Sequence, residues 1–180
     1  TGLPQGAAVI ETPIENAYLT ATSAMDYFIS LDSLNALAFS GTNADGWYLP
    51  EARQALQTGA IAYAGKYSAP DYEMLLQGGC GVSIQSTMIL HSPDVKEQLE
   101  RLGIPVLVER SSYESDPLAR MEWIKVYGLL LDKLPQAEAI FAQKVAELQP
   151  VLQQPAAGGT AAFFYITSSG AVNVRRHNDY

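Results

Sequence analysis

The sequence predicts an α/β protein, in which a mostly parallel sheet flanked by helices is followed by a long helix and a β-hairpin. Three observations predict this fold. Short apolar, β-prone runs alternate with segments of helical period over residues 1–134. Several helical segments begin near a proline or end at a glycine, as helices in folded proteins often do. One long helical pattern then precedes two β-prone runs that flank a turn.

Five strands are expected in the first part of the chain, each a short apolar run. Because helical segments separate these runs, neighbouring strands are expected to pair in parallel, with each connection crossing back over the sheet. The expected strands span residues 8–11, 36–39, 61–64, 82–86 and 106–108.

Helices are expected between these strands and after them. The fourth is the most clearly marked, with Ser92 at the cap position, Pro93 at the first helical position and Gly103 just beyond its end. The expected helices span residues 18–29, 50–56, 70–76, 93–102, 117–131 and 135–153.

The proline and the two glycines of residues 153–159 are typical of a linker. After it, a strand is expected at residues 160–166, with a hairpin partner at 171–174. We therefore divide the chain into an amino-terminal α/β lobe at 1–134, a linking helix at 135–154 and a further segment at 155–180.

Composition narrows the function classes. With 48% hydrophobic and 17% charged residues, the chain is expected to be globular and to bury a core. A formal net charge of -8 and a sequence pI near 4.6 oppose binding to phosphate backbones, so no nucleic acid partner is expected. No apolar run reaches the ~18 residues that a membrane-spanning helix needs.

Motifs of enzymes and cofactor sites are not found. The stretch from Gly59 to Lys66 has five residues between its glycines instead of the four of a phosphate-binding loop, and Tyr67 replaces the hydroxyl residue that reaches magnesium. The chain also has no nucleophile elbow and no dinucleotide fingerprint. We therefore expect no enzymatic activity and no cofactor.

Single titratable residues give no catalytic or metal site. Cys80 stands in an apolar, glycine-rich run and is expected to be a small packed residue at a strand entrance. His91 and His177 lack carboxylates or thiolates at the spacing of a zinc site, so no metal is expected to bind the protein directly. Three acids could furnish an acid–base pair, but without a nucleophile or metal they are expected to be solvated. They are Glu109, Glu114 and Glu122.

A ligand site is expected where the strands end, because the crevice of an open parallel sheet lies beyond the carboxyl ends of its strands. Aromatic, hydroxyl and cationic residues follow the expected strands, a mixture that suits a bulky, partly apolar organic ligand. The expected ligand contacts are Tyr18, Trp47, Tyr67, Met88, Arg110 and Tyr113. Arg110 would meet any anionic group. The alternative is that Tyr18, Met88 and Tyr113 only anchor their loops.

Three blocks of the sequence resemble the iron-siderophore, haem and cobalamin class of periplasmic binding proteins. They are residues 63–76, 99–108, which hold the segment Leu-Gly-Ile-Pro-Val, and 109–125. Their order, with a tyrosine loop before that segment and a helical region after it, carries the likeness. The resemblance implies two α/β lobes joined by one long helix, with residues 155–180 as the start of a second lobe cut short.

The resemblance also implies a function. The chain would belong to an extracytoplasmic solute-binding component of an ABC importer, periplasmic or held at the membrane by a lipid anchor outside this chain. It would capture a ferric siderophore, haem or corrinoid between two lobes and deliver it to a permease. Asp94 and Glu97 are the expected docking carboxylates, although Asp94 also suits the positive end of its helix. A chelatase-like enzyme on a related doubly wound fold is the alternative.

The hairpin segment is expected to lack a core of its own. An isolated two-stranded hairpin is marginally stable and leaves its strand edges unpaired. Residues after about 155 are therefore expected to be mobile or to drive self-association, whereas the lobe up to about 134 is expected to fold alone.

Overall fold

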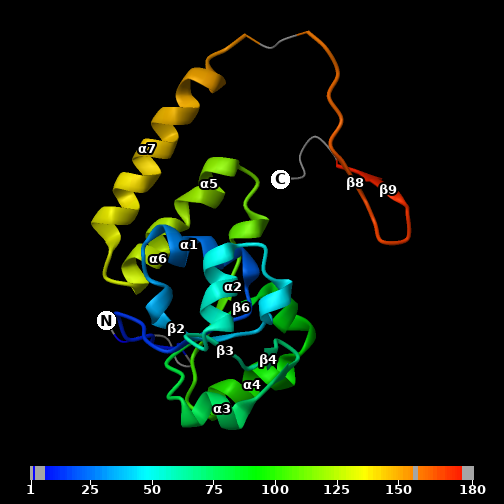
Figure 1. Cartoon of the computed structure of the whole chain (residues 1–180). Helices are drawn as coiled ribbons and strands as arrows, with labels where there is room; N and C mark the ends of the chain where they lie inside the picture. Colours follow the sequence, from blue (N-terminus) through cyan, green and yellow to red (C-terminus); the bar gives the residue numbers. More distant parts are fainter. Residues whose placement is uncertain (1, 3–6, 156–157, 176–180) are drawn as a thin grey trace.

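The computed structural model describes residue 2 and residues 7–155 and 158–175 (Figure 1). Its centre is a wholly parallel five-stranded sheet with the strand order β3-β2-β1-β6-β7. The parallel α/β fold is thereby confirmed. The strands of this sheet are β1 Ala17–Leu19, β2 Leu37–Ser40, β3 Ala62–Tyr63, β6 Ser83–Ser86 and β7 Val106–Glu109.

Seven α-helices occur in the described residues, and short 3₁₀ turns connect several of them to strands. The helices are α1 Met25–Ser30, α2 Pro50–Gln57, α3 Tyr72–Gln77, α4 Pro93–Arg101, α5 Pro117–Glu122, α6 Ile124–Leu130 and α7 Leu134–Leu152. The 3₁₀ turns are η1 Thr22–Ala24, η2 Leu34–Ala36, η3 Ala44–Gly46, η4 Thr87–His91 and η5 Ser111–Tyr113. A small antiparallel pair, β4 Gly65–Lys66 and β5 Ala69–Pro70, follows β3.

Helices cover both faces of the sheet, and each face has its own hydrophobic cluster. The larger cluster packs one face against residues of α1, α2, α6 and α7, with Leu19 and Phe28 among its members. The smaller cluster packs the other face against α3 and α4, and includes Tyr18 and Leu99. Tyr18 and Leu19 thus point to opposite faces, as neighbouring residues of a strand do. The strands are consequently buried from both sides.

The expectation for the first strand and first helix was wrong. Residues 8–11 form no strand, and the central strand is β1, which the sequence pattern had placed at the start of a helix over 18–29. That helix begins only at Met25, after the η1 turn. The three residues of β1 are too few to show a strand period, while the apolar residues that follow fit helical spacing.

Most other elements agree with the sequence pattern. The structure confirms the helices expected at 50–56, 70–76, 93–102 and 135–153 to within two residues at each end. Gly103 follows α4 with a φ of 80°, as expected of a residue that ends a helix, although the Ser92 side chain makes no capping bond. The helix expected at 117–131 is divided at Trp123, whose indole N–H donates to Glu114 Oε1 at 2.9 Å.

The long helix α7 is fixed to the lobe at its amino-terminal end. Ala137 is wholly buried against α6, and Lys133 Nζ donates to the carbonyl oxygens of Leu31 and Asp32 at 2.6 and 2.8 Å. Its other end extends away from the lobe (Figure 1). The division of the chain into lobe, linking helix and further segment remains a prediction.

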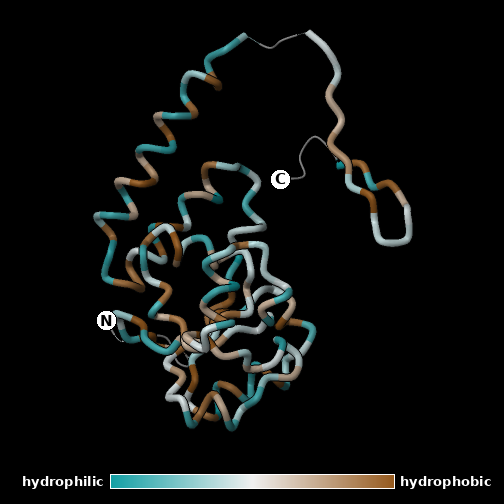
Figure 2. Tube along the Cα trace, viewed as in Figure 1, coloured by the Kyte–Doolittle hydropathy of each residue, from teal (hydrophilic) through white to brown (hydrophobic). Residues whose placement is uncertain are grey.

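The hairpin expected near the end of the described chain is confirmed. Strands β8 Phe164–Ile166 and β9 Val172–Val174 pair antiparallel, and all six of their residues are exposed. Figure 2 shows hydrophobic residues along both strands. A two-stranded ribbon has no second layer to cover its apolar side chains, so these remain exposed to solvent.

Gly128 sets how closely α6 and α7 pack. A Cβ at this position would lie 2.6 Å from the Cβ of Ala137 and 3.1 Å from the Cα of Leu134. We therefore predict that Gly128→Ala forces the two helices apart and lowers the free energy of unfolding by about 1–3 kcal/mol. Urea denaturation measures this change. The control is Leu129→Ala, because Leu129 is exposed on the same helix; equal stability of both variants and the wild type would contradict the prediction.

Candidate functional site

The carboxyl ends of the five parallel strands lie along one side of the sheet, which we call the carboxyl edge. It consists of the residues that end or follow each strand, at 20–23, 41–47, 64–68, 86–88 and 109–113. From β1 the chain proceeds to β2 and β3 on one side and later adds β6 and β7 on the other. The order therefore reverses between β1 and β6, the place where open α/β sheets bind ligands.

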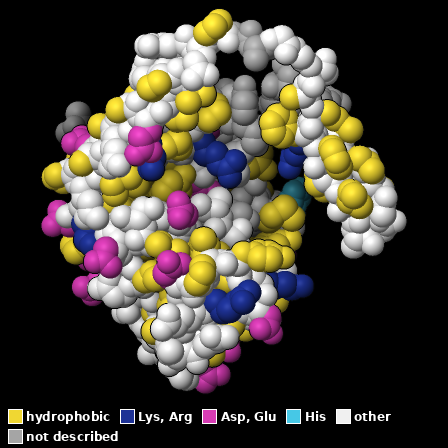
Figure 3. Space-filling model, turned by 45° about the horizontal axis from the view of Figure 1, so that its top comes forward, with side chains coloured by type: hydrophobic (Ala, Val, Ile, Leu, Met, Phe, Trp, Pro, Cys, Tyr) yellow, Lys and Arg dark blue, Asp and Glu magenta, His cyan; other side chains and the backbone are white. Residues whose placement is uncertain are grey.

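Polar side chains meet at this reversal point. Thr20 Oγ1 donates to Gln85 Oε1 at 2.7 Å, and Gln85 Nε2 donates to Ser83 Oγ at 2.7 Å. Gln85 is wholly buried, so these bonds satisfy an amide that would otherwise be costly to bury. Figure 3 shows basic side chains among hydrophobic ones on the face of the molecule that comes forward in that view.

Two of the expected ligand contacts are wrong, because their rings lie inside the lobe. Tyr18 is 0% exposed in β1, and its hydroxyl donates to the Gly65 carbonyl oxygen at 2.7 Å. Burial raises the pKa of Tyr18 far above its ordinary value. Trp47 is 4% exposed, and its indole N–H lies 3.3 Å from Ser40 Oγ. Both side chains stabilise the loops of the edge from within and present no face to a ligand.

Three other expected contacts come together beside β6 and β7. Tyr113 is 64% exposed, and its hydroxyl lies 2.8 Å from Thr87 Oγ1. The Arg110 guanidinium carbon is 5.8 Å from the centre of the Tyr113 ring. Met88, which follows Thr87 in η4, is exposed as well. We call Thr87, Met88, Arg110 and Tyr113 the β7 rim.

Tyr67 lies apart from the β7 rim. It is half-buried in the turn between β4 and β5, which follow β3, and β3 and β7 are the two outermost strands of the sheet. A ligand that contacted Tyr67 and Arg110 together would have to extend along the whole edge.

Two features of the edge escaped the sequence reasoning. Thr87 was not singled out, although it holds the Tyr113 ring through its hydroxyl. On the loop after β2, Tyr48 is 96% exposed while its neighbour Trp47 is buried. The sequence shows two adjacent aromatic residues there, and only the tertiary packing decides which one faces solvent.

Glu109 is buried, contrary to the expectation of a solvated side chain. It is 1% exposed at the end of β7, where Oε1 accepts from the Ser111 amide at 2.7 Å and Oε2 accepts from Ser23 Oγ at 2.8 Å. Burial first, and then the nearby charge of Glu109, raises the pKa of Tyr127. The other two candidate acids have separate partners, Glu114 with Trp123 and Glu122 with Lys125.

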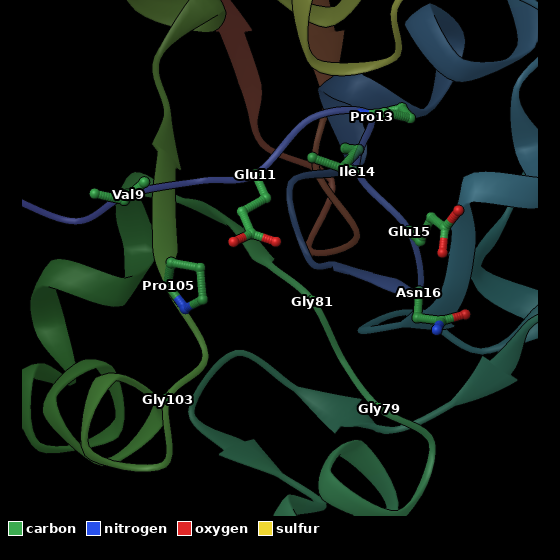
Figure 4. Close-up of a pocket in the computed structure, with 10 residues that line it drawn as sticks. All are labelled: Val9, Glu11, Pro13, Ile14, Glu15, Asn16, Gly79, Gly81, Gly103 and Pro105. Carbon is green, nitrogen blue, oxygen red and sulfur yellow. The ribbon is translucent and has the colours of Figure 1, made fainter.

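A depression lies at the opposite edge of the sheet. It has a volume of about 480 Å³ and is lined by residues that precede β1, β6 and β7, including Glu11, Asn16, Gly81 and Pro105. Figure 4 shows the Glu11 carboxylate directed into the opening between Gly81 and Pro105. Because ligands of open parallel sheets bind at the carboxyl ends, we do not assign the ligand to this depression.

Cys80 is the packed residue that the sequence indicated. It is partly buried against the smaller hydrophobic cluster, and its thiol lies 3.5 Å from the Val82 carbonyl oxygen. Burial raises the pKa of the Cys80 thiol from 9.0 to about 11. At neutral pH the thiol is therefore protonated and a weak nucleophile.

We predict slow alkylation of Cys80 in the folded protein. A thiol of pKa about 11 has roughly one hundredth of the thiolate that a thiol of pKa 9.0 has at pH 8. Iodoacetamide should therefore react about a hundredfold more slowly with folded than with urea-unfolded protein. In the folded protein the rate should rise about tenfold per pH unit between pH 8 and 10. Equal rates in both states at pH 8 would contradict the assigned environment.

The described residues contain neither a helix that could span a membrane nor a cluster of metal-binding side chains. No helix within residues 7–155 combines the length and apolar character needed to cross a bilayer. In the same described part, no three His, Cys, Asp or Glu side chains gather closely enough to hold a metal ion. His177 lies outside the described residues.

No family model matches the chain. An uncharacterized lipoprotein of Methanocaldococcus jannaschii is 26% identical over 98 residues, which cover 53% of this chain and 23% of that protein. Among solved structures, the periplasmic haem-binding protein HutB of Vibrio cholerae has a TM-score of 0.66 at 16% identity, covering 91% of this chain and 59% of its own.

Two further solved structures show the same likeness. A periplasmic haem-binding protein of Pseudomonas aeruginosa has a TM-score of 0.65 at 21% identity, covering 91% of this chain and 57% of that one. The triscatecholate siderophore-binding protein FeuA of Bacillus subtilis has a TM-score of 0.59 at 14% identity, covering 79% and 47%. The chain thus spans about half the length of these proteins and has the α/β lobe fold of the siderophore- and haem-binding class.

Proposed function

We propose that the chain is the ligand-binding amino-terminal lobe of an extracytoplasmic solute-binding protein, which captures a metal chelate for an ABC importer. The observation that carries this proposal is the β7 rim at the carboxyl edge. FeuA is described in complex with ferri-bacillibactin, and the other two similar structures are described as haem-binding proteins. These descriptions support a metal chelate as the ligand. The word lipoprotein in the name of the Methanocaldococcus jannaschii relative supports a location outside the cytoplasm, with the protein held at the membrane by a lipid anchor.

The chemistry of the β7 rim suits an anionic ligand with a planar or apolar surface. The exposed ring of Tyr113 and the thioether of Met88 offer apolar contact area, and the Thr87 bond limits the motion of the ring. Arg110 supplies a positive charge in a chain whose formal net charge is -8, so an anionic chelate is drawn to this point of an otherwise acidic protein. Tyr67 would contact the far end of a large ligand.

Binding fits this site better than catalysis by a chelatase-like enzyme does. General acid–base chemistry needs a side chain that is free to exchange a proton with the substrate. The buried carboxylate nearest the rim in sequence, Glu109, has both oxygens engaged by protein donors. The residues that the β7 rim exposes are suited to contact and charge recognition.

The proposal predicts which side chains determine affinity. Arg110→Glu and Tyr113→Ala should each weaken ligand binding at least tenfold, because they remove the cation and the aromatic surface of the rim. Intrinsic fluorescence and thermal shift should be followed with a ferric tris-catecholate, haemin and cobalamin. Arg101→Glu is the matched control, because Arg101 is an exposed arginine on α4. A response to none of the three ligands would contradict the proposed function.

Delivery to a permease is part of the same proposal. Asp94 and Glu97 are both exposed on α4, so they are accessible to basic residues of a membrane partner. We predict that the double variant Asp94→Lys, Glu97→Lys reduces uptake in a reconstituted system and leaves ligand affinity unchanged. The control is Glu51→Lys, Glu138→Lys, which makes the same charge change at exposed sites on α2 and α7. Equal uptake by both double variants would leave Asp94 as a helix-stabilising acid only.

Self-association through the exposed hairpin remains a prediction. The apolar side chains of β8 and β9 support it, because unpaired strand edges with exposed apolar residues pair readily with other strands.

A further inference from the structure

Glu109 is buried in the interior of the lobe, and it takes part in no ion pair of the described residues. Those ion pairs are Lys96–Glu100, Lys125–Glu122 and Lys144–Glu147. Its carboxylate is held by one hydroxyl and one amide, at 2.8 and 2.7 Å. A buried carboxylate is costly unless hydrogen bonds replace its hydration, and bonds to a charged acceptor are stronger than neutral ones.

The fold alone does not require an acid at this position. Residues two apart on a strand face the same side of the sheet, and Leu107, two residues before Glu109, packs against the larger hydrophobic cluster. An apolar residue of similar volume is often as stable as a buried charged group, or more so. The role of the carboxylate therefore lies in the two groups that it binds, the Ser23 hydroxyl and the Ser111 amide.

Its two bonds join loops that follow two different strands. Ser23 lies in η1, after β1, and Ser111 begins η5, after β7. Within η5, the Tyr113 amide donates to the Arg110 carbonyl oxygen at 2.9 Å, and the Glu114 amide donates to that of Ser111 at 3.2 Å. The Ser111 amide thus attaches the backbone of this turn to Glu109, in addition to the side-chain bond between Tyr113 and Thr87.

We propose that Glu109 is a positioning residue, whose carboxylate fixes the η5 turn so that Arg110 and Tyr113 stand at the carboxyl edge in the geometry that meets the ligand. The inference rests on the proposed function, which it deepens. Glu109 itself does not touch the ligand, because its side chain is buried beneath the turn. Its effect is to hold the rim in one conformation before binding, so that less conformational entropy is lost when the ligand arrives.

Hydrogen exchange on the ligand-free chain tests the attachment directly. In Glu109→Ala, the amides of Ser111, Tyr113 and Glu114 should exchange at least tenfold faster relative to the core amides of β6. Glu109→Gln should retain most of the protection, because its amide oxygen can accept from Ser111 and its NH₂ can donate to Ser23 Oγ. Ser23→Ala, which removes one of the two bonds, should give an intermediate rate and serves if Glu109→Ala does not fold.

Leu99→Ala separates positioning from a general loss of stability. Leu99 is wholly buried in the smaller cluster, on the other face of the sheet. Its truncation should lower the free energy of unfolding by about 2–5 kcal/mol while leaving the relative exchange of the η5 amides unchanged. Unchanged η5 exchange in both Glu109→Ala and Ser23→Ala, or an equal increase in Leu99→Ala, would overturn the proposal.

Ligand binding provides the second readout. With haemin and a ferric tris-catecholate as probes, Glu109→Ala should weaken binding of the accepted probe about tenfold, Glu109→Gln should restore it, and Leu99→Ala should not change it. Faster η5 exchange with unchanged affinity would overturn the positioning role. If the wild type binds neither these two probes nor cobalamin, the proposed function fails, and hydrogen exchange alone decides whether Glu109 fixes the turn.

Discussion

Burial of the short strand β1 between its two neighbours and between both helix layers is the constraint on which the rest of the lobe depends. Ala17, Tyr18 and Leu19 are at most 1% exposed, and β1 pairs with β2 on one side and β6 on the other. The backbone polar groups of this strand are satisfied by its neighbours, and the Tyr18 hydroxyl is satisfied by Gly65. Both hydrophobic clusters form around this strand, and the reversal of strand order begins beside it.

The same arrangement separates structural from exposed polar groups at the carboxyl edge. Gln85 and Glu109 point into the interior and bond to neighbouring loops, whereas Arg110, Tyr113 and Met88 point outward. Buried hydrogen bonds of this kind give loops a defined conformation. A binding surface made from such loops needs little reorganisation to receive a rigid ligand, which is the property expected of a solute-capturing lobe.

Local signals in the sequence predicted four of the helices well, because proline at a helix start and glycine after a helix end act within a few residues, as at Pro93 and Gly103. The central strand β1 could not be predicted in this way, since its burial comes from pairing with strands distant in sequence.

The loop after β7 was located correctly, and Arg110 and Tyr113 are exposed on it as expected. Tyr18 was wrongly expected at the carboxyl edge because the first strand was placed at residues 8–11, whereas Tyr18 lies within β1. Glu109 was misjudged because a carboxylate is usually solvated, and only the register of β7 shows that its side chain faces the core.

The central claim is that the ligand meets the lobe at the β7 rim and not at the depression on the opposite edge. Chemical-shift mapping of the isotopically labelled chain with a gallium tris-catecholate and a gallium porphyrin, both diamagnetic, tests it most directly. We expect amide shifts concentrated at residues 86–88 and 110–113 for the accepted ligand. Shifts concentrated at Glu15, Gly81 and Gly103, with an unchanged β7 rim, would contradict the account.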